Sequence, residues 1–199
     1  AAHVAEIMGL PINKLYVTTN ENDIMHRTLK TGDMTLKNVK STISPSMDIQ
    51  ISSNFERQLF ESLDSNSDDL NTLMLEFYND KGKQLNDNLL KKLQKIYSSK
   101  SVNDLDTIKT IQYFNEKYNY ISDPHTATSL DVLSNIKNND LNISLACAHP
   151  AKFPDSIEKA IGIDVEKPKN LKEILDKKEK YTVMENNFTK VQNYILEKI

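Results

Sequence analysis

Apolar and polar positions in the first third of the chain alternate between helical and strand patterns. Residues 1–9 read as a helix that ends at Gly9, because glycine favours the left-handed conformation that closes helices. Lys14 to Thr19 (KLYVTT) is short and rich in β-branched and aromatic residues, which is typical of a strand. A second helix then runs through Leu29 to a stop at Gly32. This helix–strand–helix order predicts one crossover of a parallel sheet.

The middle of the chain is predicted to be mainly helical. Residues 34–39 (MTLKNV) are compatible with a short strand, and residues 41–53 form a polar stretch typical of a functional loop. From residue 54 to 120 apolar positions recur every three or four residues, which predicts amphipathic helices with starts near Ser67 and Ser101. We therefore expect a helical insertion or subdomain over residues 54–121. Its apolar stripes are Phe55, Leu59, Phe60 and Leu63; Leu70, Leu73, Met74 and Phe77; Leu89, Leu90, Leu93 and Ile96; and Leu105, Ile108, Ile111 and Phe114.

The last third returns to alternation. Asp123-Pro124 is a strong helix start, because Asp accepts hydrogen bonds at the cap and Pro follows where no donor is needed. Ile143 to Ala148 (ISLACA) is a continuous apolar run, which predicts a central strand buried on both faces. A helix is expected near residues 154–161, and two amphipathic helices over residues 171–199. In the last helix, the side chains expected to face inward are those of Phe188, Val191 and Ile195.

The predicted strands are too few for a complete sheet. The strands at 14–19 and 143–148 both read as internal, and a buried strand needs neighbours for its backbone donors and acceptors. The predicted fold class is therefore α/β, with an incomplete parallel sheet. Residues 1–53 and 122–199 would belong to one large domain, interrupted by the helical part at 54–121. We expect the missing strands to come from another part of the same protein, and a chain that opens within a helix agrees with this.

Composition narrows the class of protein. The formal net charge of -3 gives no indication of nucleic-acid binding. No apolar run reaches the roughly 18 residues of a membrane-spanning helix. Cys147 is the only cysteine, so an internal disulfide is excluded and a reducing, cytoplasmic setting is the default expectation. The four histidines lack metal-ligand spacing, so no metal site is predicted.

Polar side chains gather where the two predicted internal strands end. The first strand is followed by Asn20, Asn22 and Asp23, and the second by His149 and Lys152. Ligands of open α/β sheets bind beyond the carboxyl ends of the strands, so these clusters predict a small-molecule site. The structural alternatives are a helix cap for the first cluster and a turn for the second. With 4 glycines the chain has no Gly-rich phosphate loop, so the phosphate of a phosphorylated cofactor would be held elsewhere.

Four long motifs occur in order along the chain. They are GLPINKLYVTTNENDIMHRTLKTG, SPSMDIQISSNFERQLFE, DPHTA and ACAHPAKFP. Together they resemble threonine synthase of the bacterial and fungal type, and four motifs in register are far more specific than one. The resemblance covers nearly the whole chain and is weakest over residues 64–120 and after Gly162.

The resemblance implies a fold-type II scaffold with pyridoxal 5'-phosphate as cofactor. Members of the family convert O-phospho-L-homoserine and water to L-threonine and phosphate. The family's Schiff-base lysine and its GNFG-type phosphate loop lie upstream of the position of Ala1. The chain thus resembles the C-terminal part only, holds no catalytic residue, and would bind the cofactor only together with the missing N-terminal part. Alone, it is expected to be inactive.

The resemblance also implies residue roles. Cys147 stands where the family usually has threonine and resembles the partner of the pyridine nitrogen; the alternative is a small buried hydrophobe. A thiol hydrogen-bonds weakly and is not a carboxylate, so the ring nitrogen would stay largely unprotonated. Ser129 replaces a glycine of the family's DPHTAVG motif. The cofactor-binding residues implied are Asn20, Asn22, Asp23, His125, Thr126, Cys147 and His149. The residues implied along the substrate cleft are Ser44, Asp48, Asn54, Arg57 and Lys152.

Two further functions remain open from the sequence. One is a non-catalytic binding or scaffold remnant of a fold-type II enzyme, which would use its helical middle part to bind a partner. The other is a pyridoxal-phosphate lyase that acts on another amino acid. The residues of the missing upstream part would decide between these possibilities.

Overall fold

The order of elements in the first third follows the predicted alternation. The computed structural model describes residues 1–138, 140–175 and 177–199. These form two compact units, Ala1–Val165 and Glu166–Ile199. The first unit contains α1 (Ala2–Ile7), β1 (Leu15–Thr19), α2 (Ile24–Thr31), η1 (Pro45–Met47), α3 (Ser53–Ser62), α4 (Ser67–Asn79), α5 (Asp87–Ile96), β2 (Tyr97–Ser101), α6 (Asp104–Tyr118), α7 (Pro124–Ser134), η2 (Pro150–Lys152) and α8 (Pro154–Ile161). The second unit contains α9 (Lys169–Leu175) and α10 (Phe188–Leu196).

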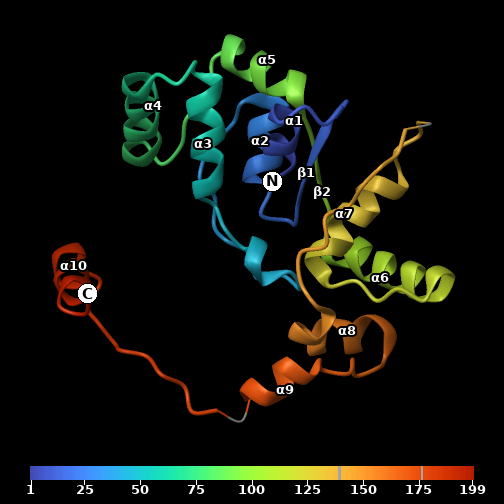
Figure 1. The fold of residues 1–199 in the computed structure, drawn as a ribbon. Helices are drawn as coiled ribbons and strands as arrows, with labels where there is room; N and C mark the ends of the chain where they lie inside the picture. Colours follow the sequence, from blue (N-terminus) through green and yellow to red (C-terminus); the bar gives the residue numbers. More distant parts are fainter. Residues whose placement is uncertain (139, 176) are drawn as a thin grey trace. The chain divides into compact units, whose positions relative to one another are not determined.

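The strands β1 and β2 pair in parallel, with Leu15 opposite Tyr97. Side chains alternate across a sheet, so neighbouring residues of β1 contact different layers. Val17 packs against the apolar cluster that contains α2 and α5. Thr18 contacts α7, where its hydroxyl lies 3.1 Å from the hydroxyl of Thr128. Helices therefore cover both faces of the sheet, with α2 and α7 on opposite sides (Figure 1).

Two apolar clusters stabilise the larger unit. The first joins α2, α3, α4 and α5, and the second joins α6, α7 and α8 (Figure 1). Several predicted stripe residues lie in these clusters, so the amphipathic pattern is confirmed at those positions. The first cluster consists of Ile24, Leu29, Met34, Leu59, Phe77, Leu85, Leu89 and Leu93. The second consists of Ile111, Ala127, Ile157 and Ala160.

The strand β2 lies inside the region that the sequence analysis predicted to be helical, so that prediction is wrong for residues 97–101. The segment reads YSSKS and lacks the apolar residues that mark a strand. Its polar side chains instead form hydrogen bonds with the residue after β1 and with α2. The hydroxyl of Ser101 donates to the carbonyl of Asn20 (2.7 Å), and that of Ser99 donates to the carbonyl of His26 (3.3 Å).

The short strand expected at residues 34–39 is not formed. Met34 and Leu36 donate backbone hydrogen bonds to the carbonyls of Lys83 and Lys81, but no regular ladder extends from them. Gly82 permits this close approach, because a Cβ atom at that position would lie 2.7 Å from the Cα of Thr35.

The predicted central strand at residues 143–148 is not formed. No strand within the described ranges pairs with it. Leu141, Ile143 and Leu145 are exposed by 87%, 71% and 57%. An apolar strand is stable only where neighbours satisfy its backbone and cover its side chains, and the two strands described here do neither for this segment.

Two local predictions also need correction. Asn66 and Asn103, rather than Ser67 and Ser101, accept the backbone hydrogen bonds at the starts of α4 and α6. In α10, Phe188, Val191 and Ile195 are 81%, 38% and 52% exposed, so these side chains do not face inward. The apolar face of α10 has no burying partner within the part of its unit that the structure describes.

Candidate functional site

Asp123 is the centre of a buried hydrogen-bond network at the start of α7. Its side chain is 1% exposed. One carboxylate oxygen accepts the backbone N–H groups of His125 (2.9 Å) and Thr126 (3.3 Å). Asp123 is therefore the N-cap of α7, as predicted. The other oxygen accepts the hydroxyl of Thr126 and the backbone N–H of Ala148 (3.2 Å). Asp123 therefore joins the helix start to a segment about 25 residues further along the chain.

The charged state of Asp123 suits this role. Burial alone would raise the pKa of its carboxyl group. Hydrogen bonds from His125 and Thr126 to the carboxylate outweigh burial and hold the pKa below its ordinary value. The group is therefore ionised at neutral pH and acts as a charged acceptor, which strengthens each of its hydrogen bonds.

Cys147 lies beside this network. Its backbone N–H donates to the hydroxyl oxygen of Thr126 at 2.8 Å, while its thiol is directed towards the carbonyl of Leu145 at 3.6 Å. Desolvation, together with the nearby Asp123 carboxylate, raises the pKa of the thiol. The residue is exposed, so it is not the small buried hydrophobe that was the alternative interpretation.

His125 connects α7 to the loop before α3. Its Nε2 accepts the backbone N–H of Ser46 (3.0 Å), so its Nδ1 carries the proton and donates to Asp123 (3.1 Å). The ring is 6% exposed and packs 4.6 Å from the ring of Phe153. Both nitrogens are thus engaged within the chain, which makes His125 a structural link between elements.

A second polar network surrounds Asn20, at the carboxyl end of β1. The side-chain amide of Asn20 donates to the hydroxyl of Ser44 (3.1 Å) and the carboxylate of Asp48 (2.7 Å). Asn22 donates to the same carboxylate at 3.0 Å, and Thr42 donates its hydroxyl to it at 2.7 Å. Asn20, Asn22 and Ser44 are each at most 3% exposed. The structure therefore brings together four of the predicted site residues, Asn20, Asn22, Ser44 and Asp48.

The two networks are neighbours in the fold. Ser101, at the end of β2, donates its hydroxyl to the carbonyl of Asn20. Thr18 of β1 contacts Thr128 of α7, and His125 of α7 accepts from Ser46, two residues beyond Ser44. The carboxyl ends of β1 and β2 thus lie beside the start of α7. The sequence analysis expected the site at the end of the strand 14–19 and of a strand at 143–148, and the second of these strands is not formed.

Other predicted site residues lie outside these networks. Asp23 pairs with Arg27 (2.9 Å), and that guanidinium also binds Asp33 at 2.6 Å. Asn54 and Arg57 are exposed on α3 and make no side-chain hydrogen bond within the described chain. Within the described chain, neither side chain is therefore tied by a hydrogen bond to the other predicted site residues.

The residues after Cys147 occupy a short helical turn. His149 caps η2, where its Nδ1 accepts the backbone N–H of Ala151 at 3.2 Å. Lys152 closes the same turn, and its side chain is exposed. His149 therefore has the turn-forming role that was its structural alternative, while its Nε2 is not engaged by any described residue.

Sequence reasoning missed two residues of the networks. Asp123 was recognised only as a helix cap, although a cap needs one oxygen and a carboxylate has two. Thr42 received no role, although it donates to Asp48 and accepts from Asn20 at 2.8 Å. No local pattern distinguishes such a threonine from an ordinary loop hydroxyl.

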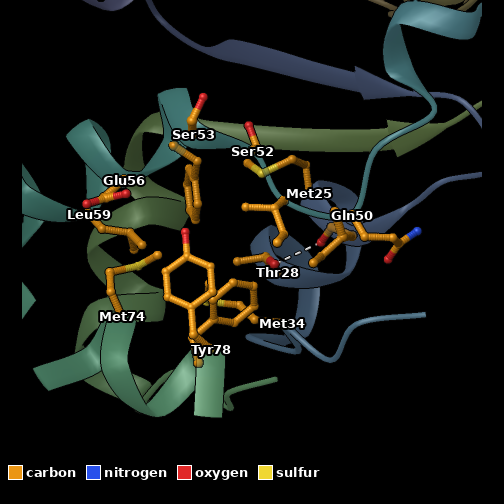
Figure 2. Close-up of a pocket in the computed structure, with 14 residues that line it drawn as sticks. Met25, Thr28, Met34, Gln50, Ser52, Ser53, Glu56, Leu59, Met74 and Tyr78 are labelled. Carbon is orange, nitrogen blue, oxygen red and sulfur yellow. Dashed lines mark hydrogen bonds between the residues drawn. The ribbon is translucent and has the colours of Figure 1, made fainter. Parts of the chain in front are cut away.

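A small pocket lies apart from both networks, between α2, α3 and α4 (Figure 2). Its walls are mainly apolar and include Met25, Met34 and Met74. The hydroxyl of Thr28 donates to the carbonyl of Ile24 (2.8 Å). None of the predicted site residues lines this pocket, so it is a local gap beside the first apolar cluster rather than the predicted site.

Metal and membrane features can be assessed over residues 1–138, 140–175 and 177–199. No group of three or more His, Cys, Asp or Glu side chains in these ranges is arranged to hold a metal ion. None of the helices in these ranges combines the length and apolarity needed to cross a bilayer.

Comparison with known proteins relates this geometry to a family. Residues 126–195 match a family model described as threonine synthase, C-terminal. Threonine synthase of Pseudomonas aeruginosa is 34% identical over 98% of this chain and 42% of its own length. That of Saccharomyces cerevisiae is 39% identical over 81% of this chain and 35% of its own length. The chain thus spans less than half the length of these relatives.

Solved structures agree. A pyridoxal-phosphate-bound threonine synthase from Brucella melitensis superimposes with a TM-score of 0.84 and 36% identity, over 98% of this chain and 42% of that one. Yeast threonine synthase gives a TM-score of 0.80 and 33% identity, over 100% of this chain and 45% of that one. The fold is therefore part of a fold-type II pyridoxal-phosphate enzyme scaffold. In sequence and in fold, the chain corresponds to a C-terminal part of threonine synthases.

The residues of this chain fit one end of pyridoxal phosphate. Cys147 presents an exposed thiol whose raised pKa keeps it neutral, and turning its proton away from the carbonyl of Leu145 would let it donate weakly to a pyridine nitrogen. The phosphate end has no corresponding cradle among the described residues. The four glycines follow helices or lie at close chain contacts, and they are scattered rather than gathered in one loop.

Proposed function

We propose that this chain is the C-terminal portion of a threonine synthase that converts O-phospho-L-homoserine and water to L-threonine and phosphate with pyridoxal phosphate. The observation that carries the proposal is the pair of buried polar networks at the carboxyl ends of β1 and β2, which place Cys147 beside the start of α7. The similarity to threonine synthases along nearly the whole chain supports it. The lysine that binds the cofactor and the loop that holds its phosphate would come from an upstream part of the enzyme.

In the proposal, Cys147 is the partner of the pyridine nitrogen. When bound, pyridoxal phosphate supplies an electron sink for reactions at the amino-acid carbons. A neutral thiol does not keep the nitrogen protonated, so this chain would favour a milder sink than a carboxylate partner would. Thr126 holds the backbone of Cys147 in place, and Asp123 in turn holds Thr126.

The remaining predicted residues would form the walls of the site. Asn20, Asn22 and Asp48 are tied together by hydrogen bonds, so they suit a rigid wall better than a mobile catalytic group. His125 keeps the loop around Ser46 against α7. On the substrate side, Ser44, Asp48, Asn54, Arg57 and Lys152 would lie along the cleft, with the exposed Lys152 and Arg57 as cations for an anionic substrate. His149 and Asp23 would complete the cofactor side.

The central test compares two proteins. The 199-residue chain with added pyridoxal phosphate is expected to release no phosphate from O-phospho-L-homoserine. The protein extended by its upstream coding region is expected to release phosphate and form threonine in equal amounts. Turnover by the 199-residue chain would contradict the division of labour proposed here. Absence of turnover in the extended protein would contradict the enzyme assignment and favour the non-catalytic scaffold.

A second candidate is a lyase of the same scaffold with another amino-acid substrate. Among the relatives are proteins called threonine synthase-like 2 from Xenopus laevis and mouse, at 33% and 34% identity. Product analysis of the extended protein with O-phospho-L-homoserine distinguishes the candidates. Both routes release phosphate, but addition of water at Cβ yields threonine, whereas loss of phosphate without that addition, followed by hydrolysis of the resulting imine, yields a keto acid and ammonia.

A further inference from the structure

Three polar residues on one face of α7 contact the segment that was predicted to be a strand. Asp123, Thr126 and Ser129 are three residues apart, so they lie on the same side of the helix. Asp123 accepts the backbone N–H of Ala148, and Thr126 accepts that of Cys147. The hydroxyl of Ser129 lies 2.5 Å from that of Ser144. The segment therefore runs antiparallel to the helix and is attached to it at three points.

The direction of each hydrogen bond follows from the number of protons. Ser129 has one hydroxyl proton and donates it to the carbonyl of Thr126 (2.8 Å), so it accepts the proton of Ser144. Thr126 likewise donates its hydroxyl proton to Asp123, so it accepts the N–H of Cys147. Both chains of hydrogen bonds thus converge on Thr126, one at its carbonyl and one at its hydroxyl.

Within the described chain, these polar contacts rather than apolar burial attach the segment to α7. Leu141, Ile143 and Leu145 are exposed, and no strand pairs with them among the described residues. The polar contacts with α7 therefore fix the backbone from Ser144 to Ala148. Ser129 supplies the contact on the N-terminal side of Cys147, and the other two contacts lie at Cys147 itself and just beyond it.

We propose that Ser129 is a positioning residue, which fixes Ser144 against α7 and thereby sets the place of Cys147. Only a side chain with an acceptor at position 129 can do this, because Ser144 donates its hydroxyl proton there. The expected effect of Ser129 on cofactor binding by Cys147 rests on the proposed function, whereas its expected effect on the backbone of residues 144–148 does not.

The test measures hydrogen–deuterium exchange at the backbone amides of residues 145–148 in the intact protein that carries this chain. Removing one hydrogen bond by Ser129→Ala or Ser144→Ala is expected to speed exchange about fivefold, the ratio that corresponds to about 1 kcal/mol. The double variant should match the single ones, because both remove the same contact. Ser129→Thr keeps an acceptor oxygen and should restore the wild-type rate. Ser134→Ala is the matched control on α7, because that hydroxyl donates only to the carbonyl of Leu130.

Unchanged exchange in Ser129→Ala would overturn the proposal, and so would equal effects of Ser129→Ala and Ser134→Ala. The second readout is kinetic. If Cys147 is displaced from the ring, kcat of the intact enzyme should fall about fivefold with KM within about twofold, and Ser129→Thr should recover kcat. Altered exchange with unaltered kcat would overturn the positioning role towards the cofactor. Failure of the proposed function is recognised separately, because wild type itself would then form no threonine.

Discussion

Asp123→Asn is expected to destabilise the larger unit by about 2–3 kcal/mol. The substitution keeps the shape of the side chain but replaces one acceptor oxygen by an NH2 donor. Every partner of the carboxylate is a donor. One oxygen accepts the backbone N–H groups of His125 and Thr126 and the ring N–H of His125. The other oxygen accepts the hydroxyl of Thr126 and the backbone N–H of Ala148. Whichever way the amide is turned, buried donors face each other. Asp123→Ala also removes the helix cap, which adds about 1 kcal/mol.

The pH dependence has a definite sign. The pKa of Asp123 in the folded chain lies below its ordinary value of 3.8, so its contribution to stability is present above that pH. The contribution is lost as the pH falls through the lower, folded pKa. The difference between wild type and Asp123→Asn should therefore be constant from about pH 5 to 8 and shrink below about pH 4.

Urea unfolding followed by circular dichroism measures the difference in the free energy of unfolding, provided the m-values agree. Asp155→Asn is the control, because Asp155 is exposed in the first turn of α8 and should change stability by less than about 1 kcal/mol. An effect of Asp123→Asn as small as that of the control would refute the view that the carboxylate organises this region.

Three further outcomes are expected. Desolvation lowers the pKa of His3, but its hydrogen bond to Glu61 (2.6 Å) outweighs this and the pKa is raised. The contribution of this pair to the amide protection of α1 should therefore be complete below about pH 6.5 and fall as the pH rises further. An equal fall in His3→Gln would contradict this. Hydrogen bonds from Thr35 and Arg27 outweigh desolvation and lower the pKa of Asp33 to about 2. Asp33→Asn should therefore lower the free energy of unfolding by about 1 kcal/mol above pH 4, given solvent screening. A destabilisation of the same size at pH 2 would show that it has another cause. In the extended enzyme, Cys147→Thr should keep most threonine formation, whereas Cys147→Asp should change the ratio of products; wild-type kinetics in the Asp variant would place the residue away from the ring.

The sequence predicted well those elements that depend on nearby residues. The Asp123-Pro124 start of α7, the stop of α2 at Gly32 and the strand β1 are confirmed within one residue. Each depends on backbone geometry or capping within a few positions. The apolar stripe residues Leu89 and Leu93 are confirmed as core for the same reason.

Elements that depend on distant partners were not predictable. β2 is polar and becomes a strand only because β1 lies beside it. The run at residues 143–148 has the composition of a buried strand, yet it has no neighbour in the described chain. Of the site residues, Asn20 and Asp48 were assigned to the cofactor and to the substrate cleft, and the sequence could not indicate that they bond to each other or that both nitrogens of His125 are engaged by other residues.

The parallel pairing of β1 with β2 has a consequence for the order of folding. The pair joins residues 15–19 to residues 97–101, so the chain closes a loop of about 80 residues before a single hydrogen bond of the sheet forms. Closing so long a loop is slow, whereas the contacts of α3 with α4 and α5 join residues that are closer in sequence. The helical cluster should therefore collapse first and bring β2 to β1. Because the networks around Asn20 and Asp123 both border this sheet, the candidate site would be among the last regions to become ordered as the chain folds.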